Sequence, residues 1–98
     1  MQLRGRIEGP CGAIDCAVDL APTKLEGYAL EGRARIPQSL LKEFGENPNG
    51  FRFRAEDGRR LEQFASPFYF GAPMECLQGE LVIRVVEADV IKQGGAAR

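Results

Sequence analysis

Hydrophobic and polar residues alternate along the first part of the chain. In residues 13–20 one side is apolar and the other carries small or acidic residues, which is the period of a half-buried strand. The apolar side consists of Ile14, Cys16, Val18 and Leu20. Residues 2–8 alternate in the same way, and a four-residue turn between the two runs places Arg6 opposite Asp15 while the apolar faces coincide. Burial and charge therefore predict the same antiparallel hairpin.

A third strand is expected over residues 27–36, followed by a short helix. Gly32 falls on the inward side of this strand, where a glycine allows a bend or a bulge. Pro37 breaks the strand and suits a helix start, and Gly45 suits a left-handed C-terminal cap. The apolar residues at helical spacing are Ile36, Leu40, Leu41 and Phe44. Since a helix of about two turns is unstable alone, we expect this stripe to cover an open end of the sheet.

The Asp57-Gly58 pair lies between two alternating runs and predicts a second hairpin. A type I′ turn there pairs residues 51–56 with residues 59–64. This register brings Phe51 and Phe64 to one face and directs Arg52, Arg54 and Arg59 to the other.

The last third of the chain is rich in apolar residues. Residues 66–74 hold three consecutive aromatic residues between two prolines, which is consistent with either an edge strand or an aromatic loop. Residues 80–91 are the longest β-prone run, and their apolar side chains fall on both faces, as in a central strand or one shared with a partner. Residues 94–98 have nothing to pack and are expected to fray.

These elements predict a mainly β, β-rich α+β fold in a single domain over residues 1–93. The expected architecture is a small bent antiparallel sheet or barrel of about six strands, with one short helix between the third and fourth strands. In outline this element order resembles the OB-type barrel, which places a helix at the same point. The resemblance concerns element order alone, so it implies no site residue.

Composition and charge exclude several functions. The chain has 98 residues, no histidine, and 13 basic against 14 acidic residues, for a net charge of −1. This balance excludes a polybasic nucleic-acid arm. The absence of histidine removes the commonest general base, and no nucleophile-elbow, phosphate-loop or dinucleotide motif is present. We therefore expect a protein that binds without catalysis and without a cofactor.

The cysteines and the N-terminus indicate a soluble, cytoplasmic protein. Cys11, Cys16 and Cys76 are an odd set in a chain without an export signal or a membrane-spanning apolar run, so free thiols are expected. A metal site built from them would lack a suitable fourth ligand. Cys11, in a turn near Arg6, is the one cysteine that we consider as an activated nucleophile.

Two segments are candidates for binding. The first consists of Phe68, Tyr69, Phe70 and Met74, which either cap the core or form an interface, most simply in a symmetric homodimer or with another protein. The alternative is single-stranded nucleic-acid or small-anion binding through Arg52, Arg54, Arg59 and Arg60. The phenylalanines of that hairpin point away from Arg52 and Arg54, and its acidic residues offset most of the charge, so nucleic acid is the weaker hypothesis.

Overall fold

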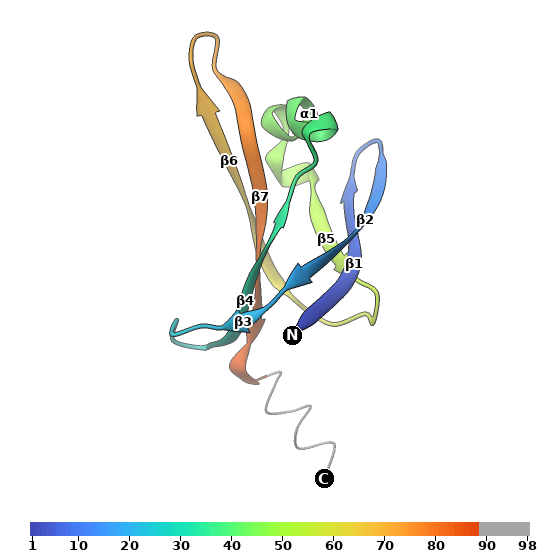
Figure 1. The fold of residues 1–98 in the computed structure, drawn as a ribbon, viewed down its shortest axis with the longest axis vertical. Helices are drawn as coiled ribbons and strands as arrows, with labels where there is room; N and C mark the ends of the chain where they lie inside the picture. Colours follow the sequence, from blue (N-terminus) through green and yellow to red (C-terminus); the bar gives the residue numbers. More distant parts are fainter. Residues whose placement is uncertain (89–98) are drawn as a thin grey trace.

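The computed structural model describes residues 1–88 and consists of two antiparallel sheets with one short helix (Figure 1). A three-stranded sheet has the order β2–β1–β5, and a four-stranded sheet has the order β3–β4–β7–β6. The elements are β1 (Gln2–Gly9), β2 (Gly12–Asp19), β3 (Ala21–Pro22), β4 (Tyr28–Arg35), α1 (Leu41–Glu46), β5 (Arg52–Ala55), β6 (Glu62–Phe70) and β7 (Glu75–Val86). Short 3-10 turns at Gln38–Leu40 and Pro48–Gly50 flank the helix.

The predicted fold class, mainly β and antiparallel with one short helix, is confirmed. Of the two architectures expected, the open one is found, because the two sheets do not close into a barrel. The chain passes from one sheet to the other at Leu20, whose N–H donates to the carbonyl oxygen of Met1 at 2.7 Å. The two-residue strand β3 was not anticipated, so the helix follows the fourth strand in place of the third.

The first hairpin has the predicted register. Arg6 lies opposite Asp15, and Leu3 lies opposite Val18. Leu3, Val18 and Leu20 are buried, whereas Ile14 beside the turn is 36% exposed. The local turn and the two-residue period were sufficient here, because the paired strands are adjacent in sequence.

The helix covers one end of the four-stranded sheet through Phe44, which is fully buried. Its ring meets Phe51 edge-on with 5.3 Å between centroids, and it lies directly over Gly79 of β7. The prediction that Gly45 caps the helix is wrong, because the helix continues through Gly45 to Glu46 and its C-cap is Asn47. A Cβ at position 45 would lie 2.5 Å from Cβ of Cys76, so this glycine allows close packing against β7.

The predicted second hairpin is wrong. β5 pairs with β1 and β6 pairs with β7, so the two runs belong to different sheets. A turn does form, but only Gly58 has a positive φ, whereas a type I′ turn needs two such residues. Phe51 and Phe53 are buried as expected, but Phe64 is 49% exposed. The β1–β5 and β6–β7 pairings form in place of the local hairpin because each of them places a whole strand against the core.

Residues 80–91 were expected to form either a central strand or a strand shared with a partner, and β7 is a central strand. It lies between β4 and β6, and both Val82 and its neighbours Leu81 and Ile83 are buried. The aromatic segment belongs to the edge strand β6, which settles the choice between strand and loop. The predicted strand end at 91, the domain boundary at 93 and the tail 94–98 lie outside the described residues.

Gly32 allows β2 and β4 to approach each other closely, and the strand has no bulge at this residue. A Cβ there would lie 2.5 Å from the carbonyl oxygen of Asp19, where the end of β2 passes over β4. The ladder irregularity of β4 falls between Tyr28 and Leu30.

Candidate functional site

Exposed phenylalanines line one face of the edge strand β6. Phe64, Phe68 and Phe70 are 49%, 56% and 67% exposed, and they share a face because residues two apart in a strand point the same way. We call these three residues the outer aromatic surface. Met74 in the following turn is 67% exposed, and Leu77, beside the irregularity of the β6–β7 ladder, is 48% exposed. The hairpin of β6 and β7 extends past α1 at the top of Figure 1.

Tyr69 lies on the opposite face of β6 and is not part of this surface. Its hydroxyl donates a 2.6 Å hydrogen bond to the carbonyl oxygen of Gly45 in α1, and its side chain is half-buried. This bond ties the extending hairpin to the helix. The outer aromatic surface is therefore held in a defined orientation while its side chains face solvent.

The end of the surface nearest the core is built around Arg84. Its guanidinium carbon lies 5.1 Å from the ring centroid of Phe64 and 5.4 Å from that of Tyr28. Its Nε donates to Glu31 at 2.7 Å. The hydroxyl of Tyr28 donates a hydrogen bond to the carboxylate of Glu62, and this bond and the negative charge of Glu62 raise the pKa of Tyr28. These cation–π contacts and charge-assisted bonds order the Phe64 ring.

The four arginines of the alternative hypothesis do not form one cluster. Arg52 and Arg54 are exposed on the outer face of the three-stranded sheet. Arg59 is packed, with its side chain 18% exposed and paired to Asp57 at 3.4 Å. Arg60 is exposed in the loop before β6.

Two arginines that the sequence analysis did not consider as binding residues lie beside Arg54. The β1–β5 register places Arg6 directly opposite Arg54. Arg4, Arg6 and Arg54 all line one depression in the surface of this sheet. This neighbourhood was missed because the pairing of β5 with β1 was not predicted. Asp15 and Glu56 also line the depression, so its positive charge is largely offset.

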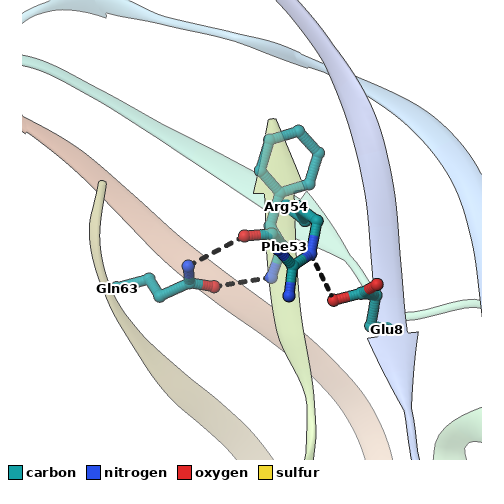
Figure 2. A network of polar contacts seen from close by, with 4 residues as sticks. All are labelled: Glu8, Phe53, Arg54 and Gln63. Atoms are coloured by element: carbon teal, nitrogen blue, oxygen red, sulfur yellow. Dashed lines mark hydrogen bonds and ion pairs between the residues drawn. The ribbon is translucent and has the colours of Figure 1, made fainter. Parts of the chain in front are cut away.

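Glu8 completes the charge pattern of this face. Its carboxylate accepts a 2.8 Å hydrogen bond from Nε of Arg54 (Figure 2). That bond, with the nearby charges of Arg54, Arg52 and Arg6, lowers the pKa of Glu8. The outer face of the three-stranded sheet thus carries charges of both signs, with Arg6 between Asp15 and Arg54, and Phe53 of β5 lies on the inner side.

The cysteines are free thiols in the structure. A hydrogen bond and the charge of Glu43 raise the pKa of Cys11, and burial raises that of Cys16. Both shifts favour the protonated thiol, the opposite of what nucleophilic activation requires. Within residues 1–88 no three cysteine, aspartate or glutamate side chains converge as a metal-binding group.

Comparisons with known proteins find no match for the chain among family models, curated proteins or solved structures. None of the helices in residues 1–88 has the length and apolarity needed to cross a membrane.

Proposed function

We propose that this protein is a non-enzymatic interaction module that self-associates as a symmetric dimer through the outer aromatic surface. The observation that carries the proposal is the row of Phe64, Phe68 and Phe70, which are about half or more exposed on one face of a tethered hairpin. Aromatic residues and methionine are enriched at protein interfaces, and the largest exposed apolar patch of a small protein is often functional.

The exposed area suits one side of a dimer interface. An aromatic side chain carries roughly 150–250 Å² of surface, so the exposed parts of the three phenylalanines amount to about 250–430 Å². One partner in a standard interface covers about 800 Å², of which about 450–520 Å² is apolar. The three rings supply half or more of that apolar area, and Met74 and Leu77 add to it at the tip of the hairpin.

A second copy of the chain is the partner that this surface suits. In a two-fold dimer the same patch meets itself, so it must be complementary to itself. On β6 the residue between Phe64 and Phe68 on this face is Ser66. The cross-strand partner of Ser66 on β7 is Glu80, whose carboxylate is already paired with Arg33 at 3.3 Å. Two such faces therefore come together with this charge already paired, and burying an unpaired charge would be costly.

The oligomeric mass tests this proposal. Sedimentation velocity over a range of concentrations should show a dimer of the 10.8 kDa chain that dissociates on dilution. Phe68→Ser and Phe70→Ser should each shift the protein to monomer while the far-UV circular dichroism of the fold is kept.

Leu25→Ser is the matched control, because Leu25 is also exposed, at 45%, but lies in the loop between β3 and β4. It should leave the mass unchanged. A wild-type protein that stays monomeric at tens of micromolar overturns the proposal. Serine variants that unfold the chain would show that the rings serve core packing instead.

A further inference from the structure

The free edge of β6 has a defined hydrogen-bonding pattern. In an antiparallel strand the N–H and C=O of one residue point to the same side, and successive residues alternate. The carbonyl oxygen of Gly79 accepts a 2.8 Å bond from the N–H of Ile36, on the side of β7 that faces β4. Gly79 is therefore turned away from β6, and its partner Pro67 forms a non-hydrogen-bonded pair with it.

It follows that the backbone of Pro67 faces the free edge of the sheet. Proline has no N–H, so the free edge of β6 lacks a hydrogen-bond donor at position 67, between Ala65 and Tyr69. Nearer the core, the side chain of Gln63 already bonds to β5, so that end of the edge is occupied. A second strand laid along β6 would find N–H groups only at Ala65 and Tyr69, on either side of the gap. Proline on an edge strand is a common device against edge pairing.

We propose that the two copies associate face to face through the outer aromatic surface, and not by pairing their β6 edges into one continuous sheet. This inference rests on the proposed function, because it specifies how the same surface is used. The aromatic side chains stand on the sheet face, perpendicular to the edge, so face packing buries them while edge pairing leaves them in solvent. Packed sheets lie about 10 Å apart, with the side chains of both faces interleaved between them.

Ser66 and Gln78 become polar residues of this interface, beside the carboxylate of Glu80, which is the cross-strand partner of Ser66. Ser66 lies between Phe64 and Phe68 on the outer face, and Gln78 is the cross-strand partner of Phe68 on β7. A further negative charge at either position would be buried next to Glu80 between two sheets in a face-to-face dimer. In an edge-paired dimer both positions remain in contact with water.

Charge and proline substitutions together decide between the two modes. Ser66→Glu and Gln78→Glu, which each add a second negative charge beside Glu80, should each raise the dimer dissociation constant at least tenfold by sedimentation equilibrium. Ala17→Glu is the matched control, an exposed glutamate on the outer face of β2 in the other sheet, and should leave the constant within about threefold of wild type. Pro67→Thr restores the missing donor and should not tighten the dimer.

The outcomes separate the two proposals. A wild-type chain that is monomeric refutes the dimer itself. A wild-type dimer whose constant is unchanged by Ser66→Glu and Gln78→Glu refutes face-to-face packing, and a Pro67→Thr variant that binds tenfold more tightly assigns the contact to the edge. If Pro67→Thr loses the circular dichroism of the fold, the two glutamate variants decide the question, since both side chains are on the outer face.

Discussion

The side-chain amide of Gln63 makes both hydrogen bonds that a neighbouring strand would make to Phe53. Its Oε1 accepts from the backbone N–H of Phe53 at 2.6 Å, and its Nε2 donates to the carbonyl oxygen of the same residue at 2.9 Å (Figure 2). β5 and β6 share no ladder, so this one side chain bridges the gap between the two sheets on the side away from Leu20.

Removing this bridge should destabilise the protein. Gln63→Ala leaves the N–H and C=O of Phe53 without partners in a partly buried place, and we expect a loss of about 1–3 kcal/mol in the free energy of unfolding. Urea denaturation followed by circular dichroism measures it. The control is Gln38→Ala, because Gln38 is exposed and its side chain makes no hydrogen bond within residues 1–88. This substitution should change the free energy of unfolding by less than about 0.5 kcal/mol. Equal effects of the two substitutions would show that the bridge contributes nothing.

Gly79 should not tolerate a side chain. A Cβ at this position would lie 2.5 Å from Cδ2 and Cε2 of Phe44, a ring that is fully buried. Gly79→Ala is therefore expected to cost about 1–3 kcal/mol through overpacking. In a double-mutant cycle, Phe44→Leu should relieve part of this cost, because the smaller side chain leaves room for the methyl group. Purely additive effects would mean that the clash is absorbed elsewhere.

Glu8 should contribute to the pH dependence of stability. The hydrogen bond from Arg54 lowers its pKa in the folded state, so its contribution is present above the ordinary carboxyl pKa and is lost as pH falls through the lowered folded-state pKa. The advantage of wild type over Glu8→Gln should therefore shrink as the solution is acidified. Urea unfolding at a series of pH values tests this. Added salt should reduce the advantage at neutral pH, because the pair is at the surface.

Strong nucleic-acid binding is not expected. The nearby carboxylates of Glu8, Asp15 and Glu56 offset the exposed arginines, and Phe53 is buried away from them, so bases have no stacking surface there. Fluorescence anisotropy with single-stranded DNA and RNA at low and moderate salt should give weak binding. Micromolar affinity with a steep salt dependence, lost in the Arg52→Ala, Arg54→Ala double variant, would contradict this expectation.

Local sequence determined the first hairpin and the existence of the other elements apart from the two-residue strand β3. The two-residue period of residues 2–8 and 13–20, joined by a tight turn, specified one register, because the strands are neighbours and a slip by one residue would reverse every side chain. Likewise, the spacing of Leu40, Leu41 and Phe44 was sufficient to predict the short helix, since only one face of it is apolar.

Tertiary structure decided which strands pair and which of two apolar faces is covered. The Asp57-Gly58 turn favours a local hairpin, but pairing with β1 and β7 buries both runs against the core and outweighs the turn. That choice placed Arg6 beside Arg54 and left Phe64 on the outer side with Phe68 and Phe70. Periodicity separates the two faces of a strand, but only the position of the strand in the sheet determines which face meets the core, and for β6 that depends on contacts far apart in the chain.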